Sequence, residues 1–459
     1  MSLLDLLRLC AALIRTRWGL RFGDRAAFLR WQRRKVQRFL NLQLARSAYY
    51  RPYAGRNLEQ LPIMDKAAMR THFDSINTAG ISLEQATKVA LQAERTRDFS
   101  PVCAGLTVGL SSGTSGSRGV FLVSPAERAR WAGILLARTL SPRMLMALCF
   151  ARQPLRVAFF LRANSNLYTT LASRRIDFRF HDLQQGLDDH LAPLAAFDPD
   201  VLVAPASILN RLAELALDGA LALRPRRVIA VAEVLEPDDN ARISQAFGGP
   251  VHQLYQCTEG FLGYTCAAGV MHLNEEFVAV EPEWLDQART RFHPVITDFS
   301  RTTQLFIRHR LDDVLRVRAT PCGCGAPGLA LAGIEGRADD VLWLTHDADD
   351  SLRPLFPDML RQAISAAERA LPDYRIEQHG AVWNVAVHDE ADASWQALTG
   401  ALDGLLRRHA LHLPEFRRVP FRADEAGAKR RRIRCIQRAQ AVVVPSQHAS
   451  SLASGRCHV

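Results

Sequence analysis

A segment rich in glycine and hydroxyl side chains, residues 110–123, offers the clearest chemistry in this sequence. Glycines let backbone N–H groups approach an anion closely, and hydroxyls add further donors. A Walker loop or a dinucleotide fingerprint would lead into a helix, whereas the flanks at 106–110 and 120–123 resemble strands. The segment predicts a phosphate-binding hairpin, with an unliganded turn as the plain alternative; its polar residues and glycines are Ser111, Ser112, Gly113, Thr114, Ser115, Gly116, Ser117 and Gly119.

A second candidate segment, Tyr255-Gln-Cys-Thr-Glu-Gly260, follows the strand-like residues 251–254. Glu259 could hold Mg²⁺, which binds one or two carboxylates beside nucleotide phosphates. Tyr255 could stack on a base. A simple turn at the end of a strand is the alternative.

Three further polar segments occur later in the chain. The segment 305–314 places Asp312 and Asp313 after a predicted strand, and such carboxylates can accept hydrogen bonds from ribose hydroxyls. Gly336 and Arg337 come next, and Lys429 opens a basic run near the end. Each segment alone could be a turn or a solvated charge cluster.

A separate constellation of three cysteines and one histidine has the composition of a zinc site. Cys266 and His272 form Cys-x5-His, and Cys322 and Cys324 form Cys-x-Cys about 50 residues later. Three thiolates and one imidazole satisfy tetrahedral Zn²⁺. Scattered buried thiols are the alternative.

Taken in their order along the chain, these segments resemble the adenylate-forming superfamily of acyl-CoA synthetases. The family's Ser-Gly-Thr/Ser-Thr-Gly loop is matched by residues 112–116, and its Tyr-Gly-x-Thr-Glu motif by residues 255–259. Its ribose, Gly-Arg and catalytic-lysine motifs are similar to residues 311–313, Gly336 to Asp340, and Gly427 to Lys429. The resemblance extends over most of the chain.

A narrower resemblance points to phenylacetate-CoA ligases and to the enzyme that adenylates a deazaflavin coenzyme. It rests on Val231-Ala-Glu-Val-Leu235, His272-Leu-Asn-Glu-Glu276 and Cys322-Gly-Cys-Gly325. Some members of that branch hold a structural zinc at similar positions. The chain departs from the family pattern at a few positions: Arg118 replaces a lysine, Gln256 a glycine, and Leu311-Asp312 a Thr-Gly pair.

The resemblance implies ATP-dependent adenylation of an aryl or small acyl carboxylic acid. Transfer to a thiol of CoA, or of the phosphopantetheine arm of a carrier protein, would follow. Adenylyl transfer to a phenolic hydroxyl and a degenerate binding or scaffold protein stay open. By analogy Thr114, Glu259 (with Mg²⁺) and Lys429 are catalytic, and the nucleotide contacts are Ser112, Gly113, Ser115, Gly116, Arg118, Ala232, Glu233, Tyr255, Thr258, Asp313 and Arg337.

The length, charge and cysteine content of the chain limit the classes of protein to which it can belong. The chain has 459 residues, 48% of them apolar, and a net charge of +11. Residues 1–56 carry a net +11 and residues 405–440 a net +8, so the remainder is acidic. A uniformly basic nucleic-acid coat is therefore excluded. Nine cysteines, an odd and small number, indicate a reducing cytoplasm, and we expect no transmembrane segment or signal peptide.

The elements that must position these residues follow from hydrophobic periodicity. Residues 24–46 predict a basic amphipathic helix, whose basic side is either plain solvated surface or a site for an anionic membrane, an acidic carrier protein or a nucleic acid. Short apolar runs alternating with helical stretches predict an α/β domain. The strands expected in it are 157–161, 201–204 and 228–231, and the helices are 125–140, 206–222 and 237–247.

We expect a large mixed α/β N-terminal domain followed by a small mobile α+β domain. The predicted bounds are a basic helical segment at 1–56, an adenylate-forming domain at 57–338, a lid at 339–442 and a disordered tail at 443–459. A homodimer stays open. In the lid the pattern predicts helices at 354–370 and 391–410 and strands at 383–387, 415–422 and 430–436.

Overall fold

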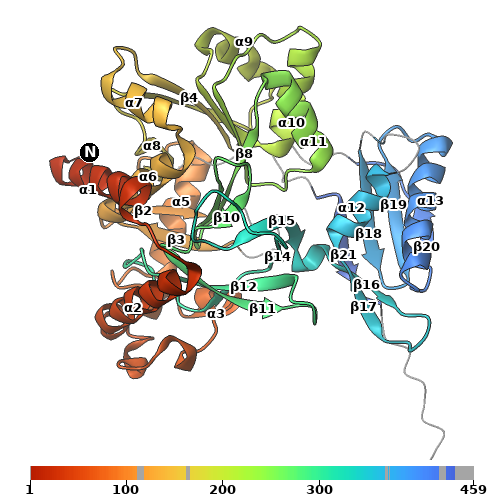
Figure 1. The fold of residues 1–459 in the computed structure, drawn as a ribbon, viewed down its shortest axis with the longest axis horizontal. Helices are drawn as coiled ribbons and strands as arrows, with labels where there is room; N and C mark the ends of the chain where they lie inside the picture. Colours follow the sequence, from red (N-terminus) through yellow and green to blue (C-terminus); the bar gives the residue numbers. More distant parts are fainter. Residues whose placement is uncertain are drawn as a thin grey trace, which may run out of the picture. The chain divides into compact units, whose positions relative to one another are not determined.

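The chain forms two compact units, one ending at Gly336 and the other beginning at Arg337. The structure is a computed structural model that describes residues 2–110, 118–161, 166–366, 371, 373–422 and 431–439. Both units combine sheets with helices (Figure 1), so the expected α/β class is confirmed.

The first unit begins with two helices, α1 (Leu3–Ile14) and α2 (Arg25–Gln43), joined through a π-helical turn at Arg15–Gly19. Asp24 caps α2 because its carboxylate accepts a hydrogen bond from the Ala27 N–H at 2.6 Å. The predicted basic helix is confirmed, and its apolar side packs inward. Single 3₁₀ turns follow at Leu44–Arg46, Arg51–Tyr53 and Leu58–Gln60.

A small sheet then presents the ends of the predicted phosphate loop. Strands β2 (Leu106–Leu110) and β3 (Val120–Val123) are antiparallel, and Leu110 pairs with Val120. Both strands confirm the predicted flanks. Residues 111–117 of the loop lie outside the described residues. The neighbouring elements are α3 (Lys66–Thr71), α4 (Phe73–Ile76), α5 (Leu83–Thr96) and β1 (Val102–Cys103).

The large sheet of this unit has a parallel half, in the order β8-β7-β6-β4-β5. Helices connect its strands, which is what parallel pairing requires. Every residue of β6 is buried, which explains the continuous apolar run in the sequence. The predicted strands and helices are present as β4 (Leu155–Leu161), β6 (Val201–Pro205), β7 (Arg227–Val231), β8 (Val251–Cys257), α6 (Pro125–Thr139), α10 (Ala206–Leu217) and α11 (Pro237–Phe247). The sequence did not predict β5 (Ile176–Asp182), α7 (Pro142–Phe150), α8 (Asn166–Thr169) or α9 (Asp188–Phe197).

One helix is shorter than expected. The pattern predicted a helix through residue 222, but α10 ends at Leu217. Gly219 adopts a positive φ of 74°, which terminates a helix and which other residues rarely adopt.

The other half of the large sheet is mainly antiparallel and continues from β8 through β9, β10 and β15 to β14, β12 and β11. The strand expected before Asp312 is present but shorter than its apolar start suggested: residues 305–307 are buried without forming a strand, Arg308 has a positive φ of 47° that interrupts the extended chain, and only His309–Arg310 pair as a strand. The strands are β9 (Gly260–Thr265), β10 (Met271–Leu273), β11 (Val278–Trp284), β12 (Arg291–Asp298), β13 (His309–Arg310), β14 (Asp313–Val317) and β15 (Ala330–Arg337).

The second unit is a four-stranded sheet in the order β20-β19-β18-β21, with two helices and a separate strand pair. The strand predicted at 383–387 is confirmed as β19; Trp383 and Val385 are fully buried and Asn384 is half-buried, but Ala386, expected on the exposed side, is buried as well. The predicted helix at 354–370 begins later, at Pro357. The elements are β16 (Leu342–Thr345), β17 (Leu352–Leu355), α12 (Pro357–Ser365), β18 (Tyr374–His379), β19 (Val382–Val387), α13 (Asp392–Arg408), β20 (Glu415–Arg418) and β21 (Ile433–Gln437), after a 3₁₀ turn at Ala338–Asp340.

The structure also addresses the expectations about membrane-spanning segments and disulfides. Among the described residues, no helix has both the length and the apolar character needed to cross a membrane. The eight cysteines in that part of the chain are all free thiols.

Candidate functional site

The Tyr255–Gly260 segment forms the end of a β-hairpin. The sequence suggested that Tyr255 follows a strand. Strand β8 instead extends through Cys257, so Tyr255 lies inside the strand. Thr258 and Glu259 form a two-residue turn, and Cys257 pairs with Gly260 on β9. The hairpin therefore places Glu259 at its tip.

Glu259 is a largely buried carboxylate beside a buried imidazole. Its Oε1 lies 4.0 Å from Nε2 of His309. Burial opposes ionisation, but His309 and hydrogen bonds from Thr258 and Cys257 outweigh it and lower the pKa of Glu259. Glu259 is thus an anion at neutral pH, which a metal ligand requires.

Tyr255 and Asp313, which the sequence offered as separate contacts, are bonded to one another. The tyrosine hydroxyl donates to Oδ2 of Asp313 at 2.6 Å. Burial, and next the charge of Asp313, raise the pKa of Tyr255 well above its ordinary value. The hydroxyl therefore stays protonated and fixes the orientation of the carboxylate. The tyrosine ring is buried in an apolar cluster, which limits the surface it can offer to a base.

Arg301 connects this hairpin with the strand that follows the phosphate loop. Its guanidinium donates to the carbonyls of Thr258 at 2.7 Å and Leu122 at 2.8 Å. Nothing in the sequence singled out this arginine, because both of its partners are backbone oxygens far away in the chain.

Glu127 supports the same region from the start of α6. Its carboxylate accepts hydrogen bonds from the hydroxyl and N–H of Thr303 at 2.7 and 2.9 Å. It also accepts from the Ser124 N–H, which completes a capping box. The Ser-x-x-Glu spacing of that box was a visible signal in the sequence.

Ala232 and Glu233 follow β7, at the carboxyl end of a parallel strand, where α/β sheets commonly bind ligands. Ala232 has a positive φ of 67° and turns the chain. Glu233 accepts a hydrogen bond from the Ser207 N–H at 2.9 Å, at the start of α10. The turn is thereby fastened to the neighbouring strand–helix connection.

The other nucleotide candidates either have local partners or lie outside the described residues. Arg118 is paired with Glu94, with its Nη1 2.6 Å from the carboxylate. Arg337 opens the second unit, and its N–H donates to Asp340 at 2.8 Å. Outside the described residues lie the phosphate-loop candidates and the candidate lysine: Ser112, Gly113, Thr114, Ser115, Gly116 and Lys429.

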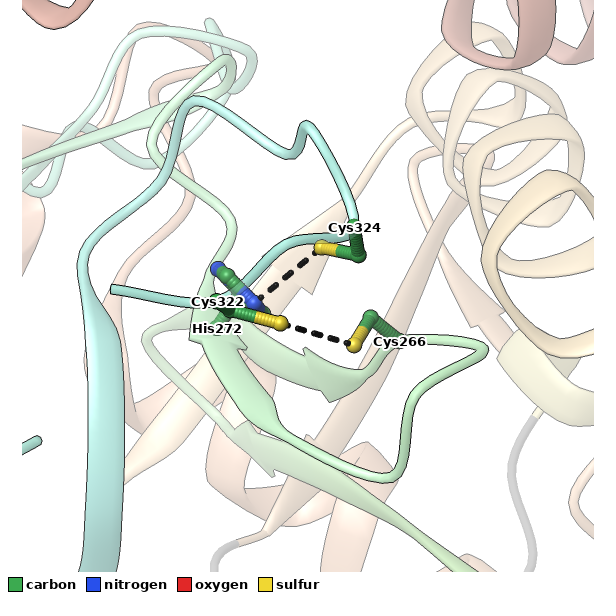
Figure 2. Close-up of side chains that lie close together, drawn as sticks. All are labelled: Cys266, His272, Cys322 and Cys324. Atoms are coloured by element: carbon green, nitrogen blue, oxygen red, sulfur yellow. Dashed lines mark hydrogen bonds between the residues drawn. The ribbon is translucent and has the colours of Figure 1, made fainter. Parts of the chain in front are cut away.

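The structure brings together all four members of the cysteine–histidine constellation (Figure 2). Cys266 follows β9, His272 lies on β10, and both cysteines of Cys-x-Cys come from the loop before β15. Their ligand atoms all lie within 4.8 Å of one another. The Sγ atoms of Cys266 and Cys322 are 3.8 Å apart, and Sγ of Cys324 is 3.4 Å from Nε2 of His272.

Hydrogen bonds orient this cluster toward one central point. Nδ1 of His272 lies 2.9 Å from the carbonyl oxygen of Gly328. A carbonyl only accepts, so Nδ1 carries the proton and the lone pair of Nε2 faces the sulfurs. Four-coordinate zinc sets its sulfurs about 3.8 Å apart, given Zn–S bonds of about 2.3 Å, so the four side chains could hold such an ion.

Comparisons with known proteins identify the fold. No protein-family model matches the chain, and no curated protein matches its sequence significantly. The chain is similar to two crystal structures of 2-hydroxyisobutyryl-CoA ligase in the postadenylation state, one in complex with R3-HIB-AMP and one with 2-HIB-AMP. In both cases the TM-score is 0.56 and the sequence identity 17%, over 94% of this chain and 88% of the other. Anthranilate CoA ligase AuaEII in complex with anthranoyl-AMP has a TM-score of 0.49 and 13% identity over 70% of this chain and 65% of its own. The chain has the fold of the adenylate-forming CoA ligases.

Proposed function

We propose that this protein is an ATP-dependent ligase that adenylates a carboxylic acid and transfers the acyl group to a thiol. The substrate carboxylate attacks the α-phosphorus of ATP and expels pyrophosphate, and the thiol of CoA or of a carrier protein then displaces AMP. The observation that carries the proposal is the ionised Glu259 at the tip of the β8–β9 hairpin. It lies in a fold shared with a ligase bound to an acyl-AMP.

The main barrier to adenylation is electrostatic, because an anion must approach a polyanion. Mg²⁺ held by Glu259 would neutralise part of the phosphate charge. Thr114, Ser115 and Gly116 donate hydrogen bonds to the phosphates. Lys429 adds a positive charge that offsets the negative charge on the phosphates in the transition state. Further contacts of the phosphate loop come from Ser112, Gly113 and Arg118.

The nucleoside is held by the hairpin and by the turn after β7. Ala232, Glu233 and Thr258 border the adenine, and Tyr255 stacks on it with what little of its ring is accessible. Asp313 and Arg337 bind the ribose. The hydrogen bond from the Tyr255 hydroxyl keeps the Asp313 carboxylate in one orientation, so less entropy is lost when the ribose binds.

The second unit acts as a mobile lid, with bounds near 339–442 and a hinge near 338–342. It delivers Lys429 for adenylation and withdraws it for thiol transfer. Replacing Lys429 with alanine should abolish acid-dependent pyrophosphate exchange and spare thiolysis of a preformed acyl-adenylate. Equal loss of both reactions would contradict the two-state lid.

The cysteine–histidine cluster holds a structural Zn²⁺ through Cys266, His272, Cys322 and Cys324. Support comes from the donor set, from the S···S separation of 3.8 Å and from the tautomer of His272. An ion bound there ties the loop before β15 to strands β9 and β10. Strand β9 is also one arm of the β8–β9 hairpin, so the ion would stabilise the site without taking part in the chemistry.

The acid is an aryl or small acyl carboxylate by analogy with phenylacetate-CoA ligases, and the protein works in a reducing cytoplasm. A panel of carboxylic acids and phenols, assayed for pyrophosphate release with and without CoA, tests the function. We expect release that depends on an acid and an acyl-CoA product when CoA is present. Release with a phenol alone, giving an AMP–phenol product, would favour adenylyl transfer instead. Absence of release with every compound would favour a scaffold protein.

A further inference from the structure

The first helix of the chain, α1, presents an apolar face to solvent. None of its residues is buried. Among the large apolar side chains that the structure describes as exposed, six lie within residues 3–18: Leu3, Leu4, Leu6, Leu7, Ile14 and Trp18. Leu3 is 74% exposed and Leu4 63%. Such a concentration of exposed apolar side chains in one segment indicates an interaction surface.

The inner side of α1 is docked in a defined position, so the exposed face is not the result of a loose helix. Leu9 and Leu13 pack on an apolar cluster beneath them. A Cβ atom added at Gly133 of α6 would lie 2.2 Å from the carbonyl oxygen of Leu9, so the two helices cross closely. The packing fixes which leucines face outward.

Helix α7 adds apolar side chains on the same unit. Met144 and Leu145 of α7 are buried in the cluster that also receives Leu9 and Leu13 of α1. On its outer side α7 exposes Met146 and Phe150, the latter at 76%. Two helices anchored in one cluster therefore both leave large apolar side chains in water.

Positive charge accompanies these apolar side chains. Residues 2–46 contain 11 arginines and lysines against two aspartates. On the outer face of α2, Arg30, Arg33, Arg34 and Arg38 are exposed, and so are Arg8, Arg15 and Arg21 in and after α1. Leucines and a tryptophan together with arginines are the composition of a helix that lies at an anionic lipid surface.

We propose that α1, together with the basic face of α2, docks this protein peripherally on an anionic lipid bilayer. The apolar side chains of α1 enter the boundary between headgroups and acyl chains, and the arginines lie against lipid phosphates. A second copy of the chain fits less well, because a two-fold contact through this face would bring two strongly basic segments together. The inference does not depend on the proposed ligase activity.

Sedimentation of the purified full chain with vesicles tests the proposal. One vesicle population contains phosphatidylcholine alone, and the other contains about 30% phosphatidylglycerol. We expect about tenfold or tighter binding to the anionic vesicles, and a steep loss of binding as NaCl rises toward about 0.5 M. Equal binding to both populations, or binding to neither, would overturn the proposal.

Paired variants separate this face from general surface effects. Leu4→Glu with Leu7→Glu, and Arg33→Gln with Arg34→Gln, should each lower binding to anionic vesicles about tenfold or more. The matched controls are Leu91→Glu with Leu217→Glu and Arg224→Gln with Arg226→Gln, which are exposed elsewhere on the first unit and should bind like the wild type. The altered residues are exposed, so we expect unchanged melting temperatures.

Light scattering distinguishes a lipid surface from a second copy. If the wild-type chain is a dimer that Leu4→Glu with Leu7→Glu converts to a monomer, and vesicles are not bound, the face is a subunit interface and the proposal is wrong. A protein with the same oligomeric state in wild type and variant, whose vesicle binding is lost only in the variant, supports it.

Discussion

The β8–β9 hairpin and the cysteine–histidine cluster occupy neighbouring strands of one sheet, yet their polar groups are arranged differently. In the hairpin region each carboxylate already has a protein partner: Tyr255 holds Asp313, and His309 lies beside Glu259. In the cluster, four ligand atoms lie within 4.8 Å of one another. The hydrogen bond that orients His272 is donated by Nδ1, the ring nitrogen that is not a ligand atom, to the carbonyl oxygen of Gly328. The hairpin suits a ligand that binds and leaves, whereas the cluster suits a permanent occupant.

The largest effect should come from breaking the cluster. Cys322→Ser removes a thiolate, and because bound zinc contributes to folding we expect a loss of about 5 kcal/mol of stability and of the bound ion. Elemental analysis of the purified protein and thermal melting measure both. Cys149→Ser, an exposed thiol on α7, is the control and should keep the zinc and the melting temperature. Wild-type protein without stoichiometric zinc would refute the metal assignment.

Breaking the hairpin should affect activity rather than stability. Glu259→Gln removes the anion expected to hold Mg²⁺ and should lower acid-dependent pyrophosphate release about 100-fold or more. The melting temperature should change little, which contrasts with the cluster variant. Glu59→Gln, at an exposed position, is the matched control. If Glu259→Gln retains wild-type release at ordinary Mg²⁺ concentrations, this carboxylate is not the metal ligand.

A smaller effect, on ATP affinity, is expected from breaking the hydrogen bond between Tyr255 and Asp313. Tyr255→Phe removes the hydroxyl that donates to Asp313 and leaves the carboxylate less restrained. We expect ATP binding to weaken by about 1–2 kcal/mol in calorimetry. Tyr53→Phe, at a partly exposed tyrosine, should have no effect. Unchanged ATP affinity in Tyr255→Phe would mean that Asp313 does not contact the ribose.

The sequence predicted what is local in the chain and missed what the sheet assembles. The parallel strands β4, β6 and β7 followed from apolar runs, because such strands are buried on both faces. By contrast, the Tyr255–Asp313 bond joins β8 to β14, and Arg301 joins backbone oxygens of two other segments. Side chains that bond backbone oxygens far along the chain leave no pattern of residue types.

Apolar composition alone also misled. In the segment expected to form a strand before Asp312, residues 305–307 are buried but form none, because Arg308 turns the backbone, and only His309–Arg310 form a strand. The cysteine–histidine constellation shows the opposite case. Its members are far apart in the chain, yet residue types with metal-ligand chemistry were enough to identify them, since few other roles require that combination.

The smallest expected effect is on the pH dependence of the melting temperature, and it comes from His181, a histidine on the edge strand β5. Burial, and next the charge of His190, lower the pKa of His181 to about 4 from its ordinary 6.5. The fold prefers the neutral ring, so its stabilising effect is complete above pH 6.5 and is lost as the pH falls toward 4. His181→Gln should therefore lose less melting temperature between pH 7 and 4.5 than the wild type. His412→Gln, at an exposed ring, is the control, and equal acid sensitivity of His181→Gln and wild type would contradict the assignment.

The central claim, attack of a carboxylate on the α-phosphorus of ATP, is tested most directly with isotope transfer. Once the panel has identified an active acid, that acid labelled with ¹⁸O in its carboxylate is incubated with ATP, CoA and the protein, and the AMP is examined by mass spectrometry. Attack by the carboxylate predicts one ¹⁸O atom in the AMP, because an acid oxygen stays on phosphorus when the thiol takes the acyl group. Unlabelled AMP, or ADP and phosphate in its place, would contradict the account.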